Sequence, residues 1–150
     1  MKYTRSFNLL MTSLINNRIN CDEGFSSNRA SYGVVVRSSN GQIIDGVAHV
    51  NKCYFFLTVA IWKACQLATG SNFKHAIIES NCKLDVSFSS SQDAPPWQIS
   101  INLSFAFALR SCNRVAHWIA QQTLMDKLPC NWIVDPPHYF VSFSRTDMQS

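Results

Sequence analysis

The sequence of 150 residues has no long apolar run, no C-x-x-C pair and no dense run of Lys or Arg. A helix that spans a membrane needs roughly 20 consecutive apolar residues, so we expect neither a transmembrane helix nor a membrane partner. Structural zinc sites usually take two ligands from one short turn. Cys53 and Cys65, the closest pair of the six cysteines, are twelve positions apart, which argues against such a site.

The six cysteines are therefore expected to be free thiols in a reducing environment. This predicts an intracellular protein of the nucleus or cytoplasm. An organelle is the alternative, because residues 1–21 contain Lys2, Arg5 and Arg18 but no acid, as presequences often do.

Acids are also scarce, with nine Asp and Glu against thirteen Lys and Arg, and the formal net charge is +4. Such a balance is compatible with a polyanionic partner such as nucleic acid. The length and the 47% share of hydrophobic residues predict one compact domain. We expect a poorly ordered leader at 1–17, a folded domain at 18–142 and a tail at 143–150.

Alternating and β-branched runs predict strands at 18–22, 32–37 and 42–50, and Asn40-Gly41 predicts a tight antiparallel hairpin between the last two. Apolar residues at helical spacing from Leu57 to Ala68 predict a helix that ends at Gly70. The remaining segments predict a strand at 75–80, a short helix at 82–88, a loop at 89–96, a strand at 101–109, a helix capped by Ser111 or Asn113, and an extended tail from Leu128.

Five stretches of this pattern resemble one known family. They are Asn20-Cys21-Asp22 with Gly24-Phe25, Gly33–Arg37 with Asn40-Gly41, Ile77–Leu84, Arg110–His117 and Leu128–Trp132. In their order and spacing they resemble the plant ribonuclease H type 1-like domains, which are related to the ribonuclease H portion of retroelement reverse transcriptases. The resemblance runs from about residue 18 to about residue 142.

The resemblance implies an α/β fold with a five-stranded mixed sheet and flanking helices. One flanking helix is expected to be missing, because Trp97–Ser100 runs almost directly into the last strand. The face left by that helix is a candidate surface for a protein partner.

Active members of the family hydrolyse the RNA strand of an RNA/DNA hybrid with two Mg²⁺ ions held by four acids. At the matching positions this chain has Asp22, Leu57, Asn81 and His117, so only the first acid is retained. The resemblance thus implies a degenerate Mg²⁺ site, with Asp22 as its one weak ligand and the two-metal activity lost. A turn-capping role for Asp22 is the alternative.

Two further side chains have open interpretations. Glu79 lies two residues before Asn81 and could compensate for the lost acids, or it could be a strand-end carboxylate paired with Lys83 or with solvent. His117 could be a proton shuttle near a phosphate or an ordinary helix-start residue.

Polar and basic residues in or near the matching stretches are the candidates for contacts with a nucleic-acid backbone. They are Asn20, Lys83, Arg110, Asn113 and Arg114.

The leading hypothesis is a ribonuclease H-like pseudoenzyme that binds nucleic acid, such as an RNA/DNA hybrid. One alternative is an active Mg²⁺-dependent hybrid ribonuclease that uses Asp22 with Glu79. Another is a non-enzymatic retroelement-derived or protein-interaction remnant.

Overall fold

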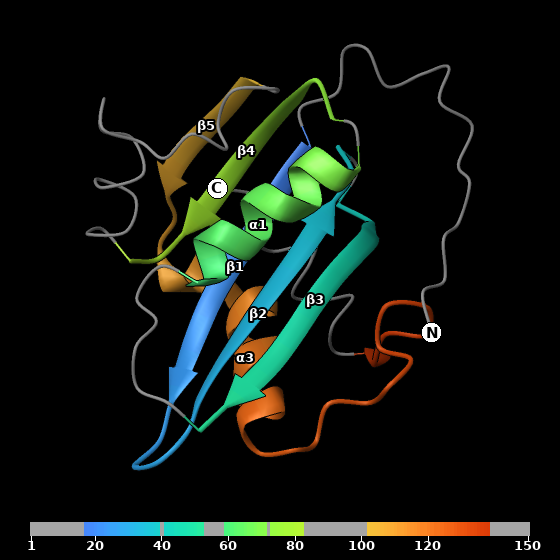
Figure 1. The fold of residues 1–150 in the computed structure, drawn as a ribbon. Helices are drawn as coiled ribbons and strands as arrows, with labels where there is room; N and C mark the ends of the chain where they lie inside the picture. Colours follow the sequence, from blue (N-terminus) through green and yellow to red (C-terminus); the bar gives the residue numbers. More distant parts are fainter. Residues whose placement is uncertain (1–16, 40, 53–58, 72, 83–101, 139–150) are drawn as a thin grey trace.

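A five-stranded sheet with one helix on each face forms the protein in the computed structural model, which describes residues 17–39, 41–52, 59–71, 73–82 and 102–138 (Figure 1). Along the chain the elements are β1 (Asn17–Phe25), β2 (Ala30–Arg37), β3 (Ile43–Asn51), α1 (Val59–Gly70), β4 (His75–Ser80), β5 (Asn102–Phe107), the 3₁₀ turn η3 (Arg110–Cys112) and α3 (Arg114–Leu124).

The strand order is β3-β2-β1-β4-β5. β1 pairs antiparallel with β2, and β2 with β3, whereas β1 to β4 and β4 to β5 are parallel. The predicted α/β fold with a mixed five-stranded sheet is therefore confirmed. β1 lies at the centre of the sheet, so its side chains meet both helical layers.

The two faces of the sheet carry separate cores. Residues on the α1 face pack with that helix, among them Ile19, Val34 and Ile78. Val35 lies on the opposite face and packs with Ile119 of α3 and with Trp132 from the segment that follows α3. This arrangement follows from the two-residue period of the strands, which sends neighbouring side chains to opposite faces.

The hairpin predicted around Asn40-Gly41 does join β2 to β3, although Asn40 itself lies outside the described residues. Gly41 has a φ of 81°, a backbone conformation that glycine adopts without the penalty of a Cβ atom. The predicted strand at 75–80 and the predicted end of the helix at Gly70 also match the structure.

Two local predictions are wrong. Asn113 is at the N-cap position of α3, but neither it nor Ser111 caps the helix with its side chain. The segment after Leu128 is not extended throughout, because backbone bonds from Trp132, Val134 and Asp135 to residues 129–131 close tight turns there. These turns bring Trp132 into the core, where 6% of it is exposed.

Several predictions fall on residues that are not described. These are the helix at 82–88, most of the leader and the tail, and the missing helix with its partner surface near Trp97. In the described part of the chain no helix is long and apolar enough to cross a membrane. The described cysteines, which leave out Cys53, are all free thiols.

Candidate functional site

The candidate site lies on the α3 face of the sheet. Arg18, Asn20 and Asp22 alternate along β1 with residues that belong to the α1 core. On β2, Gly33, Val35 and Arg37 share the α3 face, as their contacts with α3 and with Asn20 show. Two strands thus bring a row of polar side chains to the edge of the area that α3 covers.

Asp22 and His117 are joined directly. The imidazole Nδ1 lies 2.8 Å from Asp22 Oδ2, and the other carboxylate oxygen accepts the backbone N–H of Glu23 at 2.9 Å. Asp22 is 8% exposed, whereas the His117 side chain is 32% exposed. His117 is in the first turn of α3, so this contact joins the central strand to the start of the last helix.

Asn113 makes a second bond between the same two elements. Its Nδ2 donates to the backbone oxygen of Cys21 at 2.9 Å, and its side chain is fully buried. Asn113 and His117 are one helical turn apart, and Cys21 and Asp22 are adjacent. Two successive residues of β1 are therefore bonded to one turn of α3.

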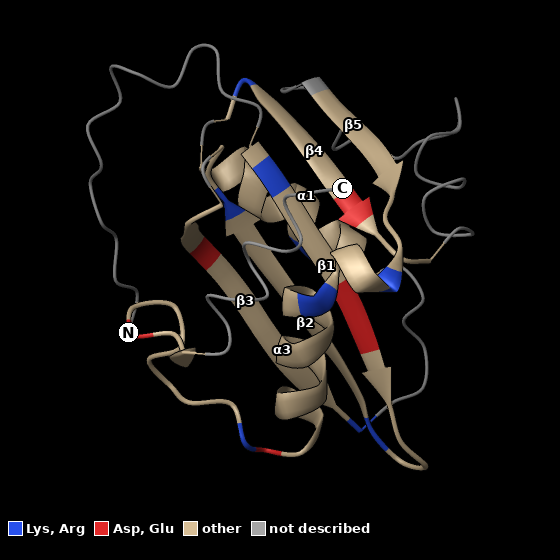
Figure 2. Ribbon diagram, turned by 180° about the vertical axis from the view of Figure 1, so that it is seen from behind, with Lys and Arg blue, Asp and Glu red and all other residues tan. Residues whose placement is uncertain are grey.

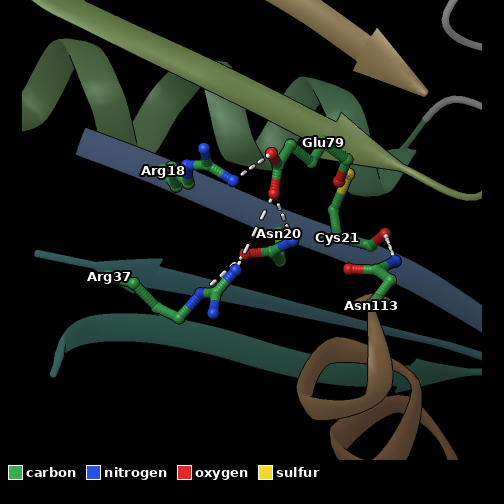
Figure 3. Close-up of polar contacts among 6 residues, drawn as sticks. All are labelled: Arg18, Asn20, Cys21, Arg37, Glu79 and Asn113. Atoms are coloured by element: carbon green, nitrogen blue, oxygen red, sulfur yellow. Dashed lines mark hydrogen bonds and ion pairs between the residues drawn. The ribbon is translucent and has the colours of Figure 1, made fainter. Parts of the chain in front are cut away.

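Glu79 lies in a polar network formed with Arg18, Asn20 and Arg37, which we call the arginine network (Figure 3). Its Oε1 accepts from Arg18 at 3.0 Å, and its Oε2 accepts from Asn20 Nδ2 at 2.9 Å. Arg37 donates through Nε to Asn20 Oδ1 at 2.8 Å and lies 3.7 Å from Glu79 Oε2.

Arg37, Asn20 and Glu79 of the arginine network are largely buried, so their hydrogen bonds and ion pairs matter for stability. Arg37 is 1% exposed and Asn20 is fully buried, while the Glu79 side chain is 12% exposed. Taking a guanidinium and a carboxylate out of water is costly unless each is paired and hydrogen-bonded. Among the described residues Glu79 is paired with Arg18 and Arg37; the predicted partner Lys83 lies outside the described residues.

The positions at which the resemblance implies other acids are only partly described. The parallel register of β1 and β4 ends with Cys21 paired with Ser80, and Asp22 and Asn81 are the residues that follow these two. Asn81 is half-buried. Leu57 lies outside the described residues, two positions before α1 begins.

These donors do not suit a pair of Mg²⁺ ions. Magnesium prefers hard oxygen ligands in octahedral geometry, whereas at the described family positions Asp22 is the one carboxylate, beside the imidazole of His117. Within the described ranges, no three His, Cys, Asp or Glu side chains gather closely enough to hold a metal ion. Glu79 itself is bonded to Arg18 and Asn20.

Basic residues flank the Asp22–His117 pair. Arg110 is exposed in η3, and Arg114 is half-buried in the first turn of α3. In Figure 2, basic segments at η3 and the start of α3 lie near the acidic segment of β1. Asn20 and Asn113, also predicted to contact nucleic acid, are fully buried and bonded inside the protein, so direct contact by their side chains is not supported.

Sequence reasoning missed the roles of Arg18 and Arg37. The signal was present, because alternation from Asp22 places Arg18 and Asn20 on its face of β1. What the sequence did not supply was the pairing of β1 with both β2 and β4, which brings Arg37 and Glu79 to either side of Asn20.

The sequence matches no protein-family model and no curated protein. Its structure is similar to that of LC11-RNase H1 in complex with an RNA/DNA hybrid, with 17% sequence identity, 76% of this chain and 100% of that chain covered, and a TM-score of 0.62. It is also similar to the N-terminal RNase H domain of a Mycobacterium tuberculosis protein, with 15% sequence identity and a TM-score of 0.61. That match covers 75% of this chain and 96% of the other.

A reverse transcriptase is also similar. Prototype foamy virus protease-reverse transcriptase has 10% identity and a TM-score of 0.56, and the match covers 75% of this chain but 21% of that one. At these identities the comparisons show an RNase H-like fold. The activity of the chain has to be argued from its own residues.

Proposed function

We propose that this domain binds nucleic acid, with an RNA/DNA hybrid as the first candidate, and that it has lost efficient two-metal hydrolysis. The observation that carries the proposal is the 2.8 Å contact between Asp22 and His117 in an RNase H-like fold. One solved protein of this fold was crystallised with such a hybrid, which supports the choice of partner.

The loss of hydrolysis follows from charge. Two Mg²⁺ ions carry four positive charges, and the described residues offer Asp22, already bonded to His117, as the one carboxylate at the family positions. Two unit charges about 4 Å apart interact by roughly 4 kcal/mol at an effective dielectric constant of 20. Losing several such attractions lowers the affinity for Mg²⁺ by more than a favourable arrangement of the remaining ligands restores.

Binding requires contacts to phosphate, and Arg110 and Arg114 are the described residues best placed to make them. Contacts of this kind fix position on the duplex and read little sequence. We therefore expect binding that depends strongly on salt and weakly on base sequence.

A titration of labelled hybrid, double-stranded DNA, double-stranded RNA and single-stranded RNA, followed by fluorescence anisotropy at several salt concentrations, tests this. Replacing Arg110 or Arg114 by Gln should weaken binding and reduce the slope of log affinity against log salt by about 1 each. Lys63→Gln is the matched control, because Lys63 is on α1 at the opposite face of the sheet. Affinity that does not change with salt would contradict backbone recognition.

A cleavage assay with the same hybrid addresses hydrolysis. The wild type and Asp22→Asn should both be inactive in Mg²⁺ above the level of a mock purification. Turnover by the wild type that Asp22→Asn abolishes would instead establish the alternative of an active Mg²⁺-dependent ribonuclease. Equal residual turnover in both would mark a contaminating nuclease.

A further inference from the structure

We infer that the Asp22–His117 pair works as a clasp between β1 and α3 in the place that the resemblance assigns to divalent cations. The domain then keeps its stability, and its binding of nucleic acid, without a divalent cation. The second half of this statement rests on the proposed function, whereas the first half does not.

The geometry of the clasp is complete without an ion. Asp22 Oδ2 is 2.8 Å from His117 Nδ1, and Asp22 Oδ1 accepts the Glu23 N–H. Close by, Asn113 Nδ2 donates to the Cys21 carbonyl oxygen at 2.9 Å. A carboxylate that is 8% exposed needs such partners, because desolvation without them costs several kcal/mol.

Charge supports the same conclusion. Carboxylates gathered at one point repel one another, and a bound cation relieves that repulsion. Here Asp22 faces an imidazole, and Glu79 is neutralised by Arg18 at 3.0 Å and Arg37 at 3.7 Å. Glu79 therefore has its counter-charge within the protein, and both oxygens of Asp22 have hydrogen-bond donors within the protein.

The hydrogen bond to Asp22 also fixes the orientation of the His117 ring. Because a carboxylate oxygen accepts hydrogen bonds, Nδ1 is the nitrogen that carries the proton donated to Asp22. His117 is therefore a positioning residue for α3 in this inference, and Asp22 is its acceptor.

Thermal unfolding of the full chain tests the clasp. The wild type should melt at the same temperature in EDTA and in millimolar Mg²⁺. Asp22→Asn and His117→Gln should each lower the melting temperature by about 3 °C or more, and the double variant should melt no lower than the less stable single variant. Asp135→Asn, an exposed control, should leave it unchanged.

His117→Asp gives the sharpest contrast, because it recreates two facing carboxylates. Its melting temperature should fall in EDTA and recover in part in Mg²⁺. A wild type that Mg²⁺ stabilises, or single-variant losses that simply add, would overturn the clasp.

A measurement on the wild type covers the case in which the variants do not fold. Long-range ¹H–¹⁵N correlation spectra of the histidine rings should show His117 as the Nδ1–H tautomer, unchanged by Mg²⁺. The opposite tautomer, or a shift of these signals with Mg²⁺, would contradict the clasp.

Binding separates this inference from the proposed function. Equal affinity for hybrid in EDTA and in Mg²⁺ supports both nucleic-acid binding and its independence of divalent cations. Affinity that appears in Mg²⁺ alone overturns the cation independence and leaves nucleic-acid binding standing. No binding under either condition overturns the proposed function, whereas the unfolding results still decide the clasp.

Discussion

Two parts of the same sheet face are built in opposite ways. Under α3, Gly24 and Gly33 leave no side chain between strand and helix, and the packing is mainly apolar. A few residues along the same two strands, Arg18 of β1 lies opposite Arg37 of β2 in the strand register. This part of the face carries the arginine network.

The two parts tolerate different kinds of substitution. A helix that packs this close needs the absence of side chains, since a Cβ at Gly33 would lie 2.8 Å from backbone atoms of both Ala116 and Ala120. The other part buries charges, and buried charges need matched partners. Shape limits substitutions in the first part and charge limits them in the second.

The largest effect is expected at the closest approach of strand and helix. Gly33→Val should lower the free energy of unfolding by about 3 kcal/mol or more, because the backbone of α3 cannot yield as a flexible side chain would. Urea denaturation measures it. Gly70→Ala is the control, since an added Cβ there meets nothing within 4 Å, and its effect should stay within about 0.5 kcal/mol of zero or be stabilising. Similar losses in both variants would refute the shape argument.

The arginine network should follow in size. Arg37→Met should cost about 3 kcal/mol, because it leaves the buried Asn20 Oδ1 without its donor and removes one of the two described cations beside Glu79. Arg18→Met should cost at most about 1 kcal/mol, since the Arg18 side chain is 39% exposed.

Adding Glu79→Gln to Arg37→Met tests whether charge causes the loss. The double variant should unfold at a higher urea concentration than Arg37→Met, because no carboxylate charge remains at position 79. A double variant that is less stable than Arg37→Met would show that packing, and not charge, dominates this part of the face.

A smaller effect is expected at Gly46, where a Cβ would strike the ring of Trp132 and the backbone oxygen of Val34. Gly46→Ala should destabilise by about 1 to 3 kcal/mol. The loss caused by Gly46→Ala should be smaller in the Trp132→Leu background than in the wild type, since the smaller side chain makes room for the added methyl group. Equal losses with and without Trp132→Leu would place the strain in the strand backbone.

The smallest effect concerns an exposed pair that joins the turn between β1 and β2 to the end of α3. Nη1 and Nη2 of Arg29 donate to Asp126 at 2.6 and 2.7 Å, and these hydrogen bonds hold the pKa of Asp126 below its usual 3.8. A lowered pKa adds stability above the pKa of the unfolded state, and this stability is lost as pH falls through the folded value.

Asp126→Asn should therefore be slightly less stable than the wild type at neutral pH, and should lose less stability below about pH 4 by the same small amount. Urea denaturation from neutral to acid pH, with Asp135→Asn as control, measures it. An acid dependence identical to that of the wild type would show that the pair does not contribute.

The strand and helix segments were predictable because they are encoded locally. Val34 to Val36 and Asn40-Gly41 predict a strand and the turn that follows it, and the spacing of apolar residues before Gly70 predicts a helix. The candidate site was predictable in part, since Asp22 and His117 were identified through the resemblance but their bond was not.

The order of residues along β1 is enough to put Arg18, Asn20 and Asp22 on one face, because side-chain direction in a strand depends on position alone. The tertiary structure alone decided which partners they meet. Residues about sixty positions apart in the chain, such as Arg18 and Glu79, become neighbours through the parallel pairing of β1 with β4. Whether an acid repels its neighbours, binds a cation or bonds to a histidine depends on distances that the folded chain sets.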